Sequence, residues 1–321
     1  MMTNKKLFIM LAAVLLVVVA VVFVAFWENG HNQFEGPGAA DGTLSYGGKD
    51  YVQKDGLETV LILGLDTFKA EEDSSYNNNK QADFLVLLVV DRREGSCKAI
   101  RINRDTMAQM NVLGVAGDKV GTVKKQIALA HTYGNGREVS CRNVANAVSG
   151  LLLGVDVDHY VSLTMEAVPV YNDFVGGVRL EVLDDFSAVD STLVKGETVT
   201  LTGEQALVYV RARYGMEDPT NEARMRRQRQ YLEILHEKSR QMAAEDDAFI
   251  SRAALKLTSY LVSDCSGNRL EELLTRLSQY ELNTILDIDG ESIQGEEFME
   301  FYPDEDSLTQ VVIECFYKEK D

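Results

Sequence analysis

An arginine cluster in the second half of the chain could carry chemistry. Six arginines lie within the nineteen residues from Arg211 to Arg229, although the formal net charge of the protein is -18. Guanidinium groups present planar pairs of donors that match phosphate oxygens. The cluster therefore predicts a locally bound phosphate. It does not predict nucleic-acid binding, because the acidic remainder of the surface would repel a duplex.

The first part of this cluster is expected at the end of a short strand. The pattern predicts a helical turn at Glu204–Leu207 and a strand at Tyr209–Arg213. Arg211 and Arg213 alternate along that strand, so both would point to one face. Like charges on one face repel each other unless an anion lies between them.

The second part of the cluster falls on a predicted helix. Arg224, Arg227 and Gln228 lie three and four residues apart, hence on one side of the helix. Arg226 and Arg229 would point elsewhere, into solvent. An ordinary solvated basic face is the alternative explanation for this helix.

Acidic residues mark the ends of three predicted strands. LETVLILGLD ends at Asp66, DFLVLLVVD begins at Asp83, and CKAIRINRD ends at Arg104 and Asp105. If the first two strands pair, both carboxylates can reach one edge of the sheet. Two carboxylates and a phosphate form a usual oxygen set for Mg²⁺, whereas aspartates that cap turns are the alternative. For general-base chemistry, Asp105, Asp218 and Glu222 all stay open.

Strands and helices must interleave to position these residues. Further helices are expected at Val123–Tyr133, Glu138–Leu153, Met165–Phe174, Arg252–Leu261, Leu270–Tyr280 and Asp306–Phe316, and further strands at His159–Leu163 and Val178–Val182. Apolar runs without alternation fit strands covered on both faces. The fold class is therefore α/β with a mostly buried central sheet.

The N-terminal run from Leu7 to Phe26 contains no charge and is long enough to span a bilayer. Lys5 and Lys6 before it orient the N-terminus toward the cytoplasm, and a cleaved signal peptide is the competing interpretation. We expect a cytoplasmic tail (1–6), a transmembrane signal anchor (7–27), a flexible Gly-rich linker (28–50), a catalytic domain (51–240) and a packed C-terminal helical extension (241–321). The main domain would then be extracellular, on the cell membrane.

The four cysteines, Cys97, Cys141, Cys265 and Cys315, show no metal-ligand spacing in the sequence. An even number outside the cell permits disulfides with three connectivities. Buried hydrophobic packing is the alternative.

An ordered set of motifs resembles the LytR-CpsA-Psr family of membrane-anchored cell-wall proteins. The matching segments are LILGLD (Leu61–Asp66), ADF (Ala82–Phe84), INRDT (Ile102–Thr106), VGGV (Val175–Val178), LTGEQALVYVRAR (Leu201–Arg213) and ARMRRQ (Ala223–Gln228). The resemblance covers Thr59 to Glu237. It implies an α/β/α sandwich with a central mixed sheet and a hydrophobic tunnel for a polyprenyl chain.

The resemblance also implies an activity and residue roles. A glycopolymer would be moved from undecaprenyl pyrophosphate to a peptidoglycan hydroxyl, with Mg²⁺ as cofactor and the bacterial membrane as partner. Asp66 and Asp83 would hold the metal. Asp105 would orient Arg104 or act near the acceptor. The pyrophosphate would be bound by Arg104, Arg211, Arg213, Arg224, Arg227 and Gln228.

This sequence departs from the family pattern at several positions. Gln81 stands where an arginine is usual, Asn103 where a proline is usual and His131 where tyrosine is common. A lysine is usual at Gln126, with Lys124, Lys125 or Arg101 as candidate substitutes. A non-catalytic binder of polyprenyl phosphate, or an envelope regulator, is therefore the alternative function. A purely structural envelope protein is a third.

Overall fold

The computed structural model describes residues 43–67, 76–212, 215–218, 221–246, 248–267, 269, 272–273, 282–296 and 298–320. The expected membrane anchor, the first part of the expected linker, Arg213 and most of the expected helix at 270–280 lie outside these ranges. Within the described residues, no helix is long and apolar enough to cross a membrane. The chain forms two compact units, and the larger one holds the central sheet.

In the described part of the chain, that sheet has six strands in the order β11-β8-β3-β4-β5-β12. Their bounds are β3 Leu57–Thr67, β4 Lys80–Asp91, β5 Ser96–Ile102, β8 His159–Thr164, β11 Leu261–Ser263 and β12 Leu282–Asp287. The β3–β4 and β4–β5 pairs are antiparallel, while β12 runs parallel to β5. The expected central mixed sheet and the hairpin between the second and third strands are thus confirmed.

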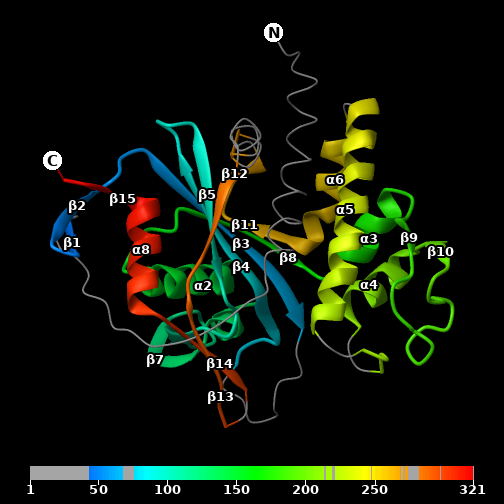
Figure 1. The fold of residues 1–321 in the computed structure, drawn as a ribbon, viewed down its shortest axis with the longest axis horizontal. Helices are drawn as coiled ribbons and strands as arrows, with labels where there is room; N and C mark the ends of the chain where they lie inside the picture. Colours follow the sequence, from blue (N-terminus) through cyan, green and yellow to red (C-terminus); the bar gives the residue numbers. More distant parts are fainter. Residues whose placement is uncertain are drawn as a thin grey trace. The chain divides into compact units, whose positions relative to one another are not determined.

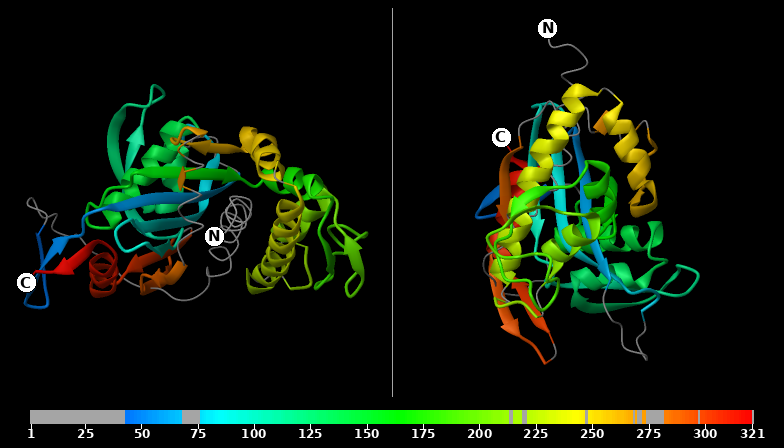
Figure 2. Two further views of the ribbon diagram at one scale, coloured as in Figure 1. Left: turned by 90° about the horizontal axis from the view of Figure 1, so that it is seen from above. Right: turned by 90° about the vertical axis from the view of Figure 1, so that its right-hand side faces the viewer.

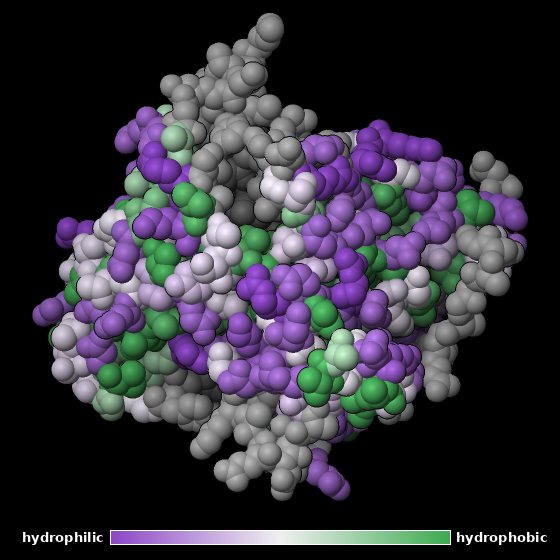
Figure 3. Space-filling view, turned by 180° about the vertical axis from the view of Figure 1, so that it is seen from behind, coloured by the Kyte–Doolittle hydropathy of each residue, from purple (hydrophilic) through white to green (hydrophobic). Residues whose placement is uncertain are grey.

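Both faces of this sheet are covered, as the apolar strand sequences require. Helices α2 (Glu138–Leu151) and α8 (Glu305–Phe316) lie on opposite faces in both views of Figure 2. Core side chains from both helices are buried in one cluster with the strands. On the face drawn in Figure 3, hydrophobic residues appear in separate groups among hydrophilic ones.

One segment of this unit differs from the expected helix. The predicted helix at Val123–Tyr133 is wrong for its first part: β6 (Met107–Leu113) and β7 (Lys119–Gln126) form a hairpin, followed by the 3₁₀ helix η1 (Ile127–Tyr133). Threonine and valine in KVGTVKKQ suit a strand, and pairing with β6 satisfies the backbone. The expected helices at 138–153 and 306–316 and the strand at 159–163 are confirmed within a few residues.

Part of the predicted flexible linker is folded. Strand β1 (Thr43–Tyr46) and β2 (Lys49–Gln53) form a hairpin, and β2 also pairs with β15 (Tyr317–Glu319). Gly47 and Gly48 have φ of 58° and 78°, the left-handed values that a two-residue hairpin turn requires. The two glycines therefore make a turn where flexibility was expected.

The C-terminal region is also more than the helical extension expected at 241–321. It contributes β11 and β12 to the central sheet and forms the hairpin of β13 (Gly290–Gln294) and β14 (Met299–Pro303) (Figure 1). Sheet positions come from long-range pairing, which short local patterns do not reveal.

The second unit is mainly helical and has its own buried core. It contains α3 (Ala167–Phe174), β9 (Arg179–Glu181), β10 (Thr198–Thr200), α4 (Gly203–Arg211), α5 (Asn221–Glu245), α6 (Phe249–Leu257) and the 3₁₀ helix η2 (Thr258–Tyr260). Strands β9 and β10 pair only with each other among the described residues.

The predicted strand at Tyr209–Arg213 is wrong, since α4 continues through Arg211. A capping box starts this helix: Gln205 N donates to Thr202 Oγ1, and Thr202 N donates to Gln205 Oε1. Ala206, Tyr209 and Val210 are buried at helical spacing. Their burial against the unit's core favours a helix over the strand that the alternating arginines suggested.

Candidate functional site

The predicted carboxylates lie at the same end of the β3–β4 pair. Asp66 lies directly opposite Gln81, and the register shifts by one residue between Gly64 and Leu65. Asp83 is the extra residue of this bulge, since Gly64 pairs with Phe84 and Leu65 with Ala82. A bulge re-aims a side chain. It is tight here, because a Cβ on Gly64 would lie 2.9 Å from the Cβ of Phe84.

Arg104 is brought to the same place by the turn after β5. Its Nη1 donates to Asp83 Oδ1 at 2.5 Å, and its Nη2 donates to Gln81 Oε1 at 3.2 Å. Its Nε lies 3.3 Å from Asp105 Oδ1. A guanidinium carries five N–H donors, so these two hydrogen bonds leave donor capacity for a phosphate. The side chains of Asp83 and Arg104 are each about one-third exposed.

The turn itself depends on Asn103. Its side-chain oxygen accepts from the backbone N–H of Asp105 at 3.0 Å, and its carbonyl accepts from Thr106 N and Oγ1. An asparagine side chain that bonds the backbone two residues on is a common turn device. Asn103 thereby supplies the turn at the position where the family usually has proline.

Asp105 is held between two donors. In addition to its ion pair with Arg104, its Oδ1 accepts from Gln126 Nε2 at 2.8 Å. Gln126 also donates to the carbonyl of Met299 on β14. This bond ties the β13–β14 hairpin to the turn that holds Asp105. Burial raises the pKa of the Asp105 carboxyl, and the nearby Arg104 guanidinium opposes that shift. Sequence reasoning treated Gln126 only as a missing lysine and missed this bridge.

Asp66 and Asp83 form a donor set that fits Mg²⁺ by type. Asp66 shares a strand face with Gln81, its cross-strand partner, and Arg104 contacts both Gln81 and Asp83. The two carboxylates therefore lie on one side of the sheet end. Mg²⁺ takes one or two protein carboxylates and completes its shell with water and phosphate oxygens. A carboxylate has about four lone-pair positions, so the contacts to Arg104 and to Thr67 N are compatible with a metal ligand.

Two of the three candidate substitutes for the missing cations, Arg101 and Lys125, are themselves engaged. Arg101 forms an ion pair with Asp287 on β12. The Nζ of Lys125 lies 3.3 Å from the Tyr76 hydroxyl and 5.2 Å from the centre of that ring. Lys125 is thus held by the aromatic side chain of Tyr76, one residue before the end of β7 at Gln126.

The remaining predicted phosphate ligands belong to the other unit. Arg211 ends α4, while Arg224, Arg227 and Gln228 are at least half-buried along α5. The exposed positions of Arg226 and Arg229 agree with the predicted sidedness of this helix. Arg213 lies outside the described residues.

Arg227 is fully buried and holds the end of α4. Its guanidinium donates to the carbonyls of Tyr209 and Ala212 and, at 2.6 Å, to Asp184 Oδ2. Gln228 Nε2 donates to the carbonyl of Val210 at 2.8 Å. Both side chains therefore bind orphan carbonyls of the last turn that carries Arg211. Sequence spacing placed them correctly on one face but gave no sign that backbone carbonyls would be their partners.

Several curated proteins are similar to this chain. One is the polyisoprenyl-teichoic acid–peptidoglycan teichoic acid transferase TagU of Halalkalibacterium halodurans, 30% identical over 58% of this chain and 54% of the relative. TagV of Bacillus subtilis is 27% identical over 88% of this chain and 70% of TagV. Biofilm regulatory protein A of Streptococcus mutans is 27% identical over 72% of this chain and 56% of that protein. The chain thus spans about half the length of TagU and of the biofilm regulatory protein.

Solved structures agree on the fold. The crystal structure of Bacillus subtilis TagV matches with a TM-score of 0.52 and 24% identity over 82% of this chain and 98% of TagV. A Streptococcus agalactiae protein matches with a TM-score of 0.56 and 20% identity over 81% of this chain and 86% of its own. The sequence also matches the family described as the LytR_cpsA_psr family over residues 31–313. This chain belongs to the LytR-CpsA-Psr family.

Proposed function

We propose that this protein transfers a glycopolymer from a polyprenyl pyrophosphate carrier to a hydroxyl of peptidoglycan. The observation that carries the proposal is the cluster at the end of β3, β4 and β5, where Arg104 contacts Asp83, Asp105 and Gln81 beside Asp66. Relatives named as teichoic acid–peptidoglycan transferases support the same reaction and both substrates. The expected N-terminal anchor would hold the cluster outside the membrane, near a lipid-linked donor.

The residues of the cluster suit phosphoryl transfer, which needs positioning and neutralisation of charge on the phosphate oxygens. The acceptor oxygen forms a bond to phosphorus, the bond to the departing polyprenyl phosphate breaks, and the hydroxyl proton passes to solvent. Arg104 would bind a phosphate oxygen with the donors that Asp83 and Gln81 do not use. Asp83 and Asp105 fix its guanidinium from two sides.

Mg²⁺ held by Asp66 and Asp83 would supply further positive charge for the phosphate oxygens. Arg211 and Arg224 are assigned to pyrophosphate binding by motif. Arg227 and Gln228 would act as positioning residues, because they bind the carbonyls at the end of α4 that carries Arg211.

A non-catalytic lipid-phosphate binder is the second candidate function. Gln81 supports it, because a neutral side chain occupies the position next to Arg104 where the family usually has arginine. The name of the Streptococcus mutans relative, a biofilm regulatory protein, points the same way.

Turnover decides between these functions. The full chain in detergent is incubated with a polyprenyl-pyrophosphate-linked glycan, peptidoglycan fragments and Mg²⁺, and transferred glycan is measured. We expect Arg104→Ala to reduce the rate about 10²- to 10³-fold, as for loss of one donor to a developing oxyanion. Removal of Mg²⁺ by a chelator and the variant Asp83→Asn should each reduce it strongly as well.

Arg93→Ala is the matched control. Arg93 lies in the turn after β4, is two-thirds exposed and pairs with Asp55 at the surface, so its loss should leave the rate unchanged. Tight binding of the donor without turnover would establish the binder instead. Turnover that is insensitive to Arg104→Ala would show that the chemistry lies elsewhere.

A further inference from the structure

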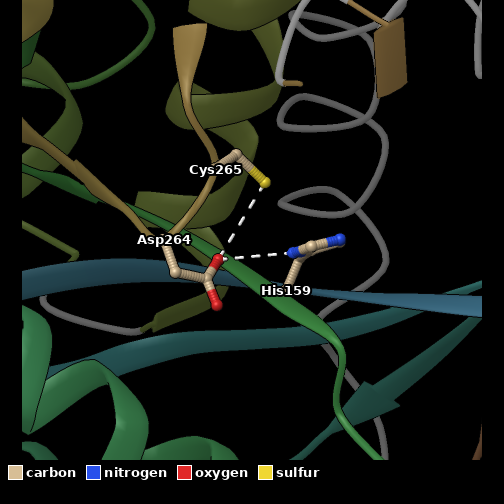
Figure 4. A group of neighbouring side chains, drawn as sticks. All are labelled: His159, Asp264 and Cys265. Atoms are coloured by element: carbon tan, nitrogen blue, oxygen red, sulfur yellow. Dashed lines mark hydrogen bonds and ion pairs between the residues drawn. The ribbon is translucent and has the colours of Figure 1, made fainter. Parts of the chain in front are cut away.

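A second cluster of ligand-type side chains lies in the sheet-containing unit. His159 is the first residue of β8, and Asp264 and Cys265 directly follow β11. These strands are neighbours at the edge of the central sheet, so residues about a hundred positions apart come together. Figure 4 shows the imidazole and thiol directed toward the same carboxylate.

The distances suit a single ion. Asp264 Oδ1 lies 3.6 Å from His159 Nδ1 and 3.9 Å from Cys265 Sγ. One ligand atom from each residue lies within 4.8 Å of the other two. In tetrahedral zinc sites with bonds of about 2.0 to 2.3 Å, ligand atoms are about 3.3 to 3.7 Å apart. Small side-chain adjustments would therefore close the site.

The surroundings of the cluster resemble those of a metal centre. The other ring nitrogen of the histidine, Nε2, lies 3.6 Å from Oε1 of Glu58, whose side chain is only 4% exposed. Histidine ligands commonly present their second nitrogen to a carboxylate in this way, which fixes the tautomer. Glu58 is thus placed to orient His159 with Nδ1 facing the ion.

The carboxylate of Asp264 is also fixed. Its Oδ2 accepts from Arg142 Nη2 at 2.5 Å, and its Oδ1 accepts from the backbone N–H of Tyr160 at 3.0 Å. The backbone N–H of Cys265 donates to Ser263 Oγ at 3.1 Å. An oxygen with two lone pairs can accept one N–H and bind a metal with the other.

We propose that His159, Asp264 and Cys265 bind Zn²⁺, with Glu58 as the positioning residue of His159. A thiolate and an imidazole favour zinc over Mg²⁺, which selects oxygen ligands. Three protein ligands leave a fourth position for water or another ligand. Binding displaces the thiol proton. The ion would join β8 to the segment after β11 and so close this edge of the sheet.

This site is separate from the carboxylates of the proposed transferase. Glu58 and Asp66 stand at opposite ends of β3, eight residues and therefore about 26 Å apart. The zinc site shares no residue with the proposed transferase site. The two can fail independently.

Cobalt substitution tests the site. The full chain in detergent is stripped with a chelator and titrated with Co²⁺, which gives a thiolate-to-metal charge-transfer band only when sulfur is a ligand. We expect one such band, displaced by one equivalent of Zn²⁺ and absent in Cys265→Ser. His159→Gln should weaken Zn²⁺ binding by at least tenfold, and Glu58→Gln by about 10- to 100-fold.

Cys97→Ser is the matched thiol control, because Cys97 is buried within the core of this unit. It should retain the band, as should Asp83→Asn, which alters the proposed Mg²⁺ site. Circular dichroism confirms that each variant is folded. Absence of the band from the wild-type protein, or its retention in Cys265→Ser, would overturn the proposal and leave only polar contacts of His159 with Glu58 and Asp264.

Discussion

At the scale of single residues, the charge state of Asp105 connects stability with the candidate site. Burial raises the pKa of this carboxyl above its ordinary value of 3.8 despite the neighbouring Arg104. The folded state therefore binds this proton more tightly than the unfolded state does. The stabilising contribution is complete below pH 3.8 and is lost as the pH rises through the folded-state pKa.

Asp105→Asn cannot undergo this loss. We expect the free energy of unfolding of Asp105→Asn minus that of the wild type to increase as the pH rises from about 3.8 to neutral. The transfer activity of the variant should be lower than that of the wild type. Urea denaturation over this pH range measures the difference, with Asp289→Asn at an exposed position as the control for charge removal alone. A difference that decreases with pH would mean that the ion pair with Arg104 outweighs the cost of burying the carboxylate.

At the scale of elements, the 3₁₀ helix η1 is joined to the first residues of β4 by partly buried polar contacts. His131 Nδ1 lies 2.9 Å from the carbonyl of Lys80. Asn78 donates to three carbonyls of residues 131, 132 and 134, and accepts from the backbone N–H of Lys80. These contacts fix the start of the strand on which Gln81 and Asp83 lie.

His131 makes this junction sensitive to acid. Burial lowers its pKa from 6.5 to about 4, so its contribution to stability is present above pH 6.5 and is lost as the pH falls toward 4. A shift of this size corresponds to about 3 kcal/mol. Between pH 7 and pH 4, we expect the free energy of unfolding of the wild type to fall by about 3 kcal/mol more than that of His131→Gln. Parallel losses in the two proteins, measured by denaturant unfolding, would contradict this assignment.

The capping box of α4 supports the helix that ends at Arg211. Thr202→Ala removes the oxygen that accepts from Gln205 N at 3.3 Å. We expect a loss of about 1 kcal/mol in the free energy of unfolding, with an unchanged dependence on denaturant. Ser191→Ala in an exposed turn is the control. An equal effect of the two substitutions would show that the cap contributes nothing specific.

At the scale of the whole molecule, local patterns predicted the positions of Asp66, Asp83 and Arg104 at strand ends better than they predicted the elements around them. Asp66, Asp83 and Arg104 could be placed because buried strands are apolar and their polar ends stand out. Contacts with Gln81 and Gln126 could not be predicted, because they depend on a register shift and on a distant hairpin.

The errors have physical reasons of the same kind. The alternation of Arg211 and Arg213 suggested a strand, but burial of Ala206 and Tyr209 at helical spacing favours α4. The cluster of His159, Asp264 and Cys265 had no local signal, since its ligands are brought together only by sheet pairing. For the four cysteines, the sequence left open either disulfides or buried hydrophobic packing. All four lie in the described ranges, none is in a disulfide, and three are buried.

The last helix shows how the C-terminal region completes the unit that holds the carboxylates. Leu308, Val311 and Val312 of α8 are buried in the same core cluster as β3, β4 and β5, and Asp304 caps the helix by accepting from Ser307 N at 2.8 Å.

We expect Leu308→Ala to lower the free energy of unfolding by about 2 to 5 kcal/mol, as for other leucines removed from packed cores. Urea unfolding followed by circular dichroism measures the loss. The exposed Leu255 of α6 provides the control Leu255→Ala, for which little change is expected because no buried contact is removed. If both variants were equally stable, α8 would not be part of the cooperative core, and β15, which continues directly from it to pair with β2, would have no rigid support.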